Sequence, residues 1–527
     1  MQRSEIDQSA QVPPLPADEE AAKAATESTS GDASEQQDEA TPSEFASHDP
    51  RTGELVGRHP LTTPTRLAEA LAVSRLAATW WQELGFAQRR IRLDQWRVSL
   101  FRQIEPIAAL ICAETGKPLD DARLELLMVL EHLRWAAEHA ERTLRRRRVA
   151  TGRLMTNHAS TVEYQPYGVV GVIGSAGEPA FAPMGSVVGA LAAGNAVILK
   201  PSELTPGVAV ALAEAFNEVV PEHPVFTVAT GDGATGAALC SVGVDKISFV
   251  GSAAAAKQVL VDCAQTLTPV AVECGGKDVM LVDSDADLVA AAESAVWGAM
   301  SNAGQNSTSL ERVYVLDEVA DRFVDLVEQR ARRLRPGGQP GADLGPVQLP
   351  SQVDVIREHL SDAIERGARC LVGGPESLRP PYVEPVILLD VPEDAAVLTE
   401  RTGGPILVIN RVPDLDAAVQ AANASAFGLG ASVFSASRGE EIAANLRAGM
   451  VAVNSAGTIG VVPALALGGT GGSGYGRVRG AAGLHEFAQA KSVTRRRGRP
   501  LINALTFGRR AGTVRRLLRL VRMRYGR

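Results

Sequence analysis

Two short stretches decide how this chain is organised: TPVAVECGGK at 268–277 and MSNAGQNSTSLERVY at 300–314. The first predicts a buried strand that ends on one carboxylate, Glu273. Two glycines follow, so the backbone there can pass close to a ligand. The second contains a Gly-Gln turn, the small hydroxyl residue Ser307, and then the apolar β-branched start of another strand. Glu273 and Ser307 are therefore the first candidates for chemistry.

Size and composition set wide bounds. The chain has 527 residues, of which 45% are hydrophobic, and it can bury a large core in two or three domains. The net charge of −8 is unevenly spread, with an acidic start and a basic end. This average says little about partners, and we expect none that is a nucleic acid.

The cysteines and the apolar stretches favour a cytoplasmic protein. The five cysteines are far apart and form no C-x-x-C pair, so neither a metal site nor a disulfide framework is expected. The N-terminus lacks the apolar segment of a signal peptide. The longest uncharged stretch, 179–199, is interrupted by Pro183 and several glycines, so we expect no transmembrane helix.

Both ends of the chain differ from its middle. Residues 1–55 are rich in Glu, Asp, Ser, Thr and Pro, and we expect an acidic disordered tail. Residues 496–527 form a basic tail. Within it, at 513–527, apolar residues (Val514, Leu517, Leu518, Val521, Tyr525) would share one helical face and arginines (Arg515, Arg516, Arg519, Arg522) the other. This pattern is typical of a helix on an anionic membrane surface, although a partner helix or the acidic tail would also fit it.

The middle of the chain predicts an α/β fold. Apolar residues recur at three- and four-residue steps over 63–148, which indicates helices. Strands are then predicted at 168–173, 196–200, 225–229 and 246–250, alternating with helices of small residues. Such alternation predicts a parallel, doubly wound sheet with ligands at the carboxyl ends of its strands. Pro206 would open one of these helices, with Thr205 as its cap.

These motifs resemble those of the aldehyde dehydrogenase superfamily. The family has E-x-G-G-K and, about thirty residues on, N-x-G-Q-x-C with an Arg five residues past the Cys. The positions in register here are Glu273, Gly275, Gly276, Lys277, Asn302, Gly304, Gln305 and Arg312. Ser307 replaces the nucleophilic Cys. Over roughly residues 65–495 the resemblance implies a Rossmann-type cofactor domain, an α/β catalytic domain and a small β element that joins subunits.

The resemblance also implies where a coenzyme binds. The run GALAAGNAVILKPSE at 189–203 is close to the family's cofactor region. Glu203 would accept a hydrogen bond from a free ribose 2′-hydroxyl and repel a 2′-phosphate, which favours NAD over NADP. Gly251 and Ser252, at a helix start, would suit a pyrophosphate. The candidate cofactor residues are Ile173, Lys200, Glu203, Gly233, Gly251, Ser252 and Arg401.

Other departures from the family cluster at the reacting centre. The family's P-W-N-[FY]-P has become SAGEP at 175–179, so that Gly177 replaces an Asn that donates to the oxyanion. Loss of one such donor typically costs roughly 10²–10³ in rate. The family's E-x-F-G-P has become RTGGP at 401–405, so that Arg401 replaces the Glu that holds the nicotinamide ribose. A serine hydroxyl also needs an adjacent base, which a thiolate does not.

Three functions remain open at this point. The resemblance implies NAD-dependent oxidation of an aldehyde to a carboxylic acid, and the substitutions imply impaired or lost turnover. The second is a non-catalytic protein that binds NAD or forms oligomers. The third is a weak serine hydrolase in which Glu273 activates Ser307. The expected domains are 56–149 with 168–273 for NAD, 150–167 with 481–495 for oligomerisation, and 274–480 for catalysis.

Overall fold

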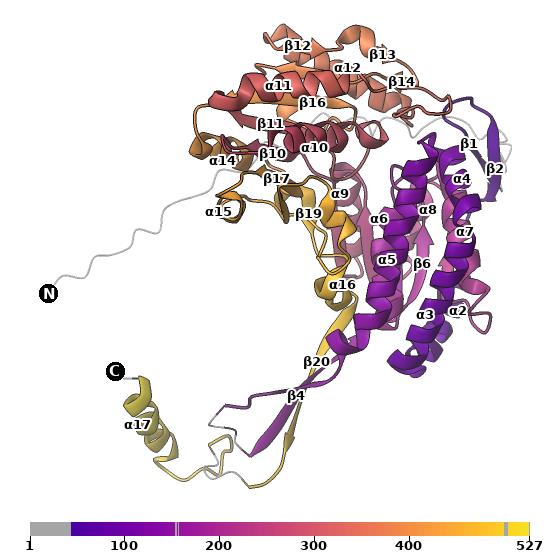
Figure 1. The fold of residues 1–527 in the computed structure, drawn as a ribbon. Helices are drawn as coiled ribbons and strands as arrows, with labels where there is room; N and C mark the ends of the chain where they lie inside the picture. The colour runs from indigo at the N-terminus through magenta and orange to yellow at the C-terminus, as the bar shows by residue number, and fades with distance from the viewer. Residues whose placement is uncertain (1–43, 153–154, 156, 500–503, 526–527) are drawn as a thin grey trace, which may run out of the picture. The chain divides into compact units, whose positions relative to one another are not determined.

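The computed structural model describes residues 44–152, 155, 157–499 and 504–525. Two mixed sheets with helical layers form most of it (Figure 1). The order of the first sheet is β19-β9-β8-β5-β6-β7, in which only β19 runs antiparallel to its neighbour. Its strands are β5 (Val169–Ile173), β6 (Ala196–Lys200), β7 (Phe226–Val228), β8 (Lys246–Val250), β9 (Val270–Glu273) and β19 (Gly474–Tyr475). The predicted parallel sheet is thus confirmed.

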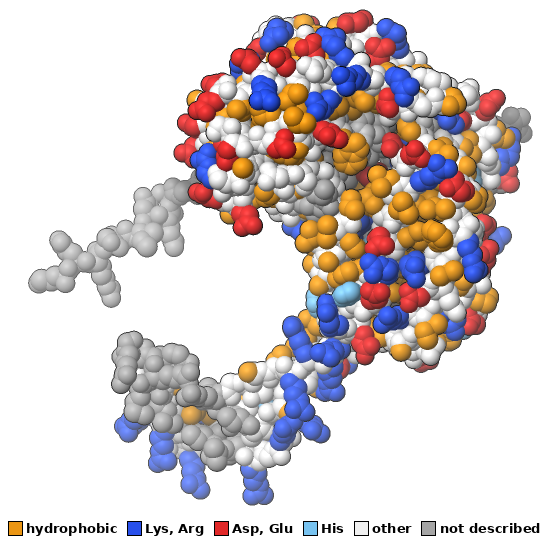
Figure 2. All heavy atoms as spheres, viewed as in Figure 1, with side chains coloured by type: hydrophobic (Ala, Val, Ile, Leu, Met, Phe, Trp, Pro, Cys, Tyr) orange, Lys and Arg blue, Asp and Glu red, His pale blue; other side chains and the backbone are white. Residues whose placement is uncertain are grey.

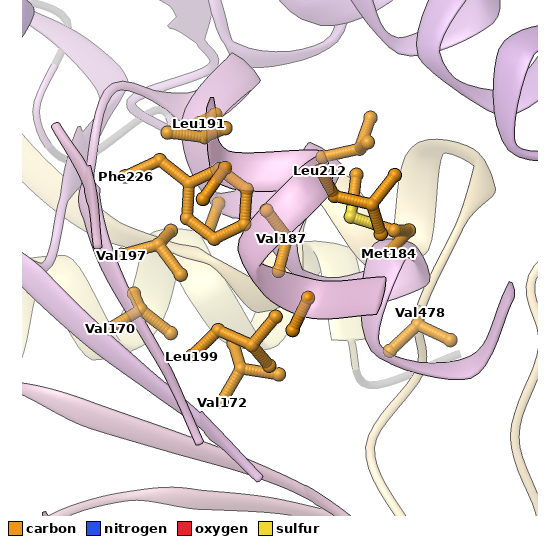
Figure 3. Close-up of a cluster of buried hydrophobic side chains, with 14 of the residues drawn as sticks. Val170, Val172, Met184, Val187, Leu191, Val197, Leu199, Leu212, Phe226 and Val478 are labelled. Carbon is orange, nitrogen blue, oxygen red and sulfur yellow. The ribbon is translucent and has the colours of Figure 1, made fainter. Parts of the chain in front are cut away.

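Helices from two parts of the chain pack against this sheet. Those between the strands are α6 (Phe181–Ala193), α7 (Pro206–Asn217), α8 (Gly233–Ser241) and α9 (Ala253–Ala264). Those outside this run are α2 (Pro64–Glu83), α3 (Gly85–Arg102), α4 (Ile104–Thr115), α5 (Leu119–Leu144) and α16 (Gly480–Glu486). Small residues on α6 let it lie close to β5 and β6, where they form one buried cluster (Figure 3).

The second sheet has the order β12-β15-β16-β11-β10-β17-β18, and only β12 is antiparallel to its neighbour. Its strands are β10 (Asp278–Val282), β11 (Leu310–Leu316), β12 (Arg369–Val372), β15 (Val386–Leu389), β16 (Ile406–Val412), β17 (Gly430–Phe434) and β18 (Met450–Val453). Its helices are α10 (Leu288–Met300), α11 (Asp317–Ala331), α12 (Pro350–Glu365), α13 (Ala396–Thr399), α14 (Leu415–Asn423) and α15 (Gly439–Ala444). Three buried apolar clusters lie among them.

Smaller elements complete the described chain. Two short hairpins are β1 (Glu44–His48) with β2 (Leu55–Pro60) and β13 (Leu378–Arg379) with β14 (Tyr382–Val383). A three-stranded sheet joins β3 (Arg147–Val149), β4 (His158–Pro166) and β20 (Ala488–Arg496). The last helix is α17 (Thr513–Tyr525). None of the helices in the described ranges is long and apolar enough to cross a membrane.

The structure corrects two of the predicted boundaries. The expected disordered tail ran to residue 55, but residues 44–48 form β1, because Ser47 is buried and Phe45 packs on His59 against β2. Residues 1–43 lie outside the described part. The expected oligomerisation segment began at 481, but 480–486 form α16, because Leu484 enters the same apolar cluster as α6.

The predicted Thr205 cap is also wrong. The Thr205 hydroxyl is buried and makes no hydrogen bond among the described residues. The N-terminus of α7 is capped instead by Glu114, whose carboxylate accepts from the backbone N–H groups of Gly207 (3.0 Å) and Val208 (3.1 Å). A carboxylate suits a helix N-terminus, where donors are free and the dipole is positive.

Candidate active site

Ser307 lies where the end of β9 meets the loop after α10. The Ser307 hydroxyl lies near the Glu273 carboxyl group and lowers its pKa against the effect of burial. The Ser307 carbonyl accepts from the Gly276 N–H at 3.0 Å. The two stretches that the sequence singled out are therefore brought together, with Ser307 next to Glu273.

The loop before Ser307 has an unusual backbone. Asn302 and Ala303 have φ values of 54° and 52°, and Gly304 has a φ of 74°. A Cβ atom at Gly304 would lie 2.1 Å from the Gly404 carbonyl oxygen, so only glycine fits there. The Asn302 amide donates to the Gly177 carbonyl at 2.8 Å. This hydrogen bond ties the loop to the 175–179 segment.

Glu178 occupies the backbone donor of Ser307. The Ser307 N–H donates to the Glu178 carboxyl group at 3.1 Å. Burial is the main cause that raises the pKa of Glu178 to about 7, and the nearby Glu125 carboxylate adds to it, whereas Lys117 and the Ser307 N–H oppose it. In acyl-transfer chemistry such an N–H is a natural donor to a developing oxyanion. Here an acidic side chain takes that position.

Gly177 does not leave an empty place for a lost side chain. A Cβ atom at Gly177 would lie 2.6 Å from the Gln305 carbonyl oxygen. The Gly177 carbonyl accepts from Lys117 (2.9 Å) as well as from Asn302. Any side chain at 177 would therefore require the backbone of one of these two loops to shift.

Arg401 covers the other side of Ser307. Its guanidinium group donates to the Asn306 carbonyl at 2.8 Å and to the Ser307 carbonyl at 3.3 Å. A Cβ atom at Gly275 would lie 1.3 Å from Nη1 of Arg401, so the guanidinium group lies directly against that glycine. The close backbone approach predicted at the two glycines is thus used by a side chain of the same protein.

Two further charged residues near Ser307, Glu273 and Arg479, are buried. Burial raises the pKa of Glu273, while the Ser307 hydroxyl, Arg479 and Arg401 oppose that rise. Arg479 is 2% exposed, and burial lowers its pKa to about 10 against the attraction of Glu178 and Glu273. Its guanidinium group lies 3.7 Å from the centre of the Phe181 ring and donates to the Gly460 carbonyl at 2.6 Å.

Comparison with known proteins places this site in a family. The sequence profile described as "Aldehyde dehydrogenase family" matches residues 37–493. The chain belongs to the aldehyde dehydrogenase family. It is 35% identical over 459 residues to the 4,4'-diapolycopene aldehyde oxidase of a Methylomonas species, covering 86% of each chain.

Solved structures show the same fold. The NAD-dependent aldehyde dehydrogenase from Sinorhizobium meliloti superposes with a TM-score of 0.83 at 30% identity, covering 88% of this chain and 92% of that one. The NADP-dependent glyceraldehyde-3-phosphate dehydrogenase from Bacillus halodurans, complexed with NADP, gives 0.81 at 28% identity, covering 86% and 96%. The predicted fold class and family are confirmed. Members of the family are oxidoreductases that use NAD or NADP, so the comparisons do not select between the two coenzymes.

The candidate cofactor residues of this aldehyde dehydrogenase-family protein lie at the carboxyl edge of the first sheet. Ile173 and Lys200 end β5 and β6, Gly251 and Ser252 follow β8, and Gly233 opens α8. Glu203 lies in the loop after β6. Its carboxylate is 3.5 Å from the Lys200 ammonium group, and burial lowers the pKa of that lysine. Ser252 caps α9 and accepts from the Ala255 N–H at 3.2 Å. Arg401 lies apart from this group, beside Ser307.

The residues of the adenosine side fit a dinucleotide better than those of the nicotinamide side. Lys200, at the end of β6, and Glu203, in the loop that follows, offer a donor and a half-exposed acceptor. Near Ser307, the Arg401 guanidinium group occupies the surface of Gly275 instead.

Three charged residues in or next to the 175–179 segment were not predicted from the sequence: Lys117, Glu125 and Glu178. Lys117 and Glu125 form a buried ion pair at 2.7 Å, and Glu125 also accepts from the N–H groups of Ala180 and Phe181 at 2.8 Å each. Glu178 was overlooked although the same motif comparison that identified Gly177 places it where the family has Phe or Tyr. A signal for Glu178 was therefore present, whereas nothing local indicated that Lys117 and Glu125 would meet.

Proposed function

We propose that this protein is an NAD-binding member of the aldehyde dehydrogenase family in which aldehyde oxidation is impaired or lost. The observation that carries the proposal is that the backbone N–H and carbonyl groups of Ser307 both have partners within the chain. The N–H donates to Glu178, and the carbonyl accepts from Gly276 and Arg401. A substrate carbonyl would find neither a thiolate nor a free backbone donor there.

The site lacks the groups that the first step of aldehyde oxidation requires. Oxidation in this family requires a nucleophile that adds to the aldehyde and donors that hold the resulting oxyanion. A serine hydroxyl is un-ionised at neutral pH and needs an adjacent base, and burial raises the pKa of the nearby Glu273. The Glu178 carboxyl group would repel an oxyanion in its ionised form. Both features oppose addition to the carbonyl.

Coenzyme binding is the part of the function that we retain. Glu203 stands where a ribose 2′-hydroxyl would be bound, and its carboxylate would repel a 2′-phosphate, which supports NAD over NADP. Lys200 lies beside it, and the N-terminus of α9 suits the pyrophosphate. Arg401 would meet the positively charged nicotinamide ring, so we expect weak binding on that side.

Purified protein tests this proposal with NAD or NADP and a panel of aldehydes, monitored by NADH or NADPH absorbance. The panel includes long apolar aldehydes, because one relative is a 4,4'-diapolycopene aldehyde oxidase. We expect calorimetry to show NAD binding, and we expect turnover no higher than that of a Glu273→Gln control. Turnover well above that control would reject the proposal.

A second function, weak ester hydrolysis, is favoured by one observation. The Ser307 hydroxyl lies near the carboxyl group of Glu273, whose pKa is raised by burial. Hydrolysis of p-nitrophenyl acetate that is abolished by Ser307→Ala would support this function. Hydrolysis that survives the substitution would reject it.

Oligomer formation and location are also proposals. The resemblance assigns subunit contacts to the β-sheet of β3, β4 and β20, and we propose a homodimer or homotetramer formed through it, to be measured by light scattering. The five cysteines are all free, which suits the reducing cytoplasm.

We further propose that the basic C-terminal segment places the protein on an anionic membrane surface. Residues 487–527 contain twelve Arg, one Lys and no acidic residue. Figure 2 shows blue Lys and Arg side chains and no red Asp or Glu side chains over the end of the chain on the face in view. On α17 the apolar Val514, Leu518 and Val521 are all exposed. Exposed apolar side chains next to arginines are suited to a headgroup region.

Vesicle sedimentation tests this interaction. We expect the full-length protein to bind vesicles that contain phosphatidylserine and not vesicles of phosphatidylcholine alone. Deletion of 496–527, or Leu518→Asp with Val521→Asp, should abolish binding, whereas Arg332→Gln on another surface should not. Binding that is unchanged by the deletion would reject the membrane proposal without affecting the proposal for Ser307.

A further inference from the structure

A cavity of about 100 Å³ lies beside Ser307. One side of it is apolar and includes the aromatic rings of Phe181 and Trp297. Leu124, Trp297 and Val461 belong to this side and are also partly exposed at the surface, with exposed fractions of 40%, 47% and 49%. A short apolar chain could therefore reach the cavity from solvent and lie along this wall.

The lining of the cavity carries more negative than positive groups. Three carboxyl groups line it, those of Asp121, Glu125 and Glu178, against the single ammonium group of Lys117. Lys117 is already paired with Glu125 at 2.7 Å and donates to the Gly177 carbonyl. Its attraction opposes the rise in the pKa of Glu178, but it forms no ion pair with that carboxyl group in the described chain.

Asp121 and Glu178 both line the cavity without an ion pair among the described residues, and of the two it is Glu178 that contacts Ser307. One oxygen accepts from the Ser307 N–H, and no hydrogen bond to the other oxygen is found among the described residues. Arg479 attracts it from a distance, but that guanidinium group is bonded to the Gly460 carbonyl and forms no ion pair with Glu178 in the described chain. Burial raises the pKa of Glu178 to about 7, as expected for a carboxyl group that lacks a nearby opposite charge.

This combination selects a class of ligand. A carboxylate at one end of an apolar cavity favours a group with hydrogen-bond donors and positive charge. An ammonium group has three donors and no acceptor, and its alkyl chain can pack against aromatic rings. An aldehyde offers only an acceptor oxygen, and a carboxylate ligand would be repelled.

We propose that the cavity binds a primary alkylammonium ion, with the ammonium group on the free oxygen of Glu178 and the alkyl chain against Phe181 and Trp297. This binding requires no transfer of electrons. It goes beyond the proposed function, because it holds whether or not the protein oxidises aldehydes.

Calorimetry with n-butylammonium tests the proposal, with n-butanol and butyrate as probes of equal chain length. At about pH 8, where Glu178 is mostly ionised, we expect butylammonium to bind at least about tenfold more tightly than either other probe, since charge-assisted hydrogen bonds are strong. Glu178→Gln should reduce butylammonium affinity by about tenfold or more. Asp120→Asn, on the exposed surface of α5, should leave it unchanged.

The pH dependence of the wild-type protein gives a second measurement that needs no variant. Butylammonium affinity should rise between about pH 6 and 8 as Glu178 loses its proton, because the ligand stays protonated throughout. The other charged groups that face Glu178 are Lys117, Asp121 and Glu125 from the α5 region, Glu273 from β9 and Arg479 before α16. A flat profile, equal binding of butanol, or full affinity in Glu178→Gln would each overturn the proposal.

Discussion

The two ends of the expected coenzyme path differ in how much of the chain's own structure fills them. At the proposed adenosine end, Lys200 and Glu203 match the family's motif, and Glu203 is half-exposed in the loop after β6. At the reacting end, Ser307 contacts Glu178 and Arg401 and lies near Glu273. The fold is preserved at both ends of this path. The structure of the sheet therefore does not depend on whether the reaction takes place.

This difference shows that the packing of the loops and the chemical groups of the site are separable in this protein. Glycines 275 and 304 keep the conformations that bring the two loops together, and the strands beneath them are fully buried. Gly177, Glu178, Ser307 and Arg401, where the motifs differ from the family pattern, determine the charges and donors of the site within this arrangement. The first three predictions below address the reacting end.

The largest expected effect is on turnover after side chains are restored. Ser307→Cys alone should raise aldehyde oxidation by no more than about tenfold, because Glu178 still occupies the N–H of residue 307. Adding Glu178→Gln and Arg401→Glu should raise it by roughly a further 10². The measurement is kcat/KM for NADH formation. Full activity from Ser307→Cys alone would show that Glu178 and Arg401 are no obstacle.

Next in size is the pH-dependent stability of Glu178→Gln. The pKa of Glu178 is raised from 4.5 to about 7, so the folded protein holds this proton more tightly than the unfolded chain. Wild-type stability should therefore fall as pH rises from about 4.5 to 7, and the loss should persist above that range. Glu178→Gln should be more stable by about 1–3 kcal/mol at pH 8 and by little near pH 4.

Chemical denaturation at several pH values measures this difference. Asp120→Asn is the control, since Asp120 is exposed and its ion pair with Arg123 lies on the surface. If Glu178→Gln raises the free energy of unfolding equally at pH 8 and pH 4, burial does not raise the pKa of this carboxyl group.

Arg401→Ala should change the affinity for NAD but not for ADP-ribose, which lacks the nicotinamide. Removing a guanidinium group near a positively charged ring should tighten NAD binding by about five- to tenfold. The matched control is Arg332→Ala, because Arg332 also donates to a backbone carbonyl, that of Leu371, away from the site. Equal changes for NAD and ADP-ribose would place the effect on the adenosine end.

The smallest effect concerns the scaffold that both ends share. Glu114→Gln should destabilise the protein by about 1 kcal/mol, because its carboxylate caps α7 through two N–H groups. Thr205→Val should be neutral or slightly stabilising, since the Thr205 hydroxyl has no hydrogen bond among the described residues. Thermal unfolding monitored by circular dichroism compares the two. A larger loss for Thr205→Val would restore the cap that the sequence predicted.

Local pattern predicted the strands of the first sheet well. The range 196–200 is the same in sequence and structure, because an uninterrupted apolar run between turns can only be buried. The predicted Thr205 cap is wrong because the Glu114 carboxylate, about ninety residues earlier in the chain, accepts the hydrogen bonds of those N–H groups. Capping by a distant residue leaves no signal in a local window.

The site shows the same limit. Glu273 and Ser307 were found because each belongs to a motif with fixed spacing. The contact between Glu178 and the Ser307 N–H depends on how two separate loops meet, and the buried pair of Lys117 and Glu125 depends on a third. Sequence indicated which residues were unusual, but only coordinates showed which of them touch.

The backbone at residues 302–304 carries one more consequence. Left-handed conformations at two non-glycine residues each cost of order 1 kcal/mol, and the hydrogen bond from Asn302 to Gly177 helps to hold them. β-branched side chains would add to that cost at 302 and 303, and any side chain at 304 would collide with the opposite loop. Substitutions that alter the backbone at 302–304 are therefore disfavoured, whereas substitutions of the side chains that project from this loop are tolerated. A cysteine at position 307 would require no rebuilding of the loop.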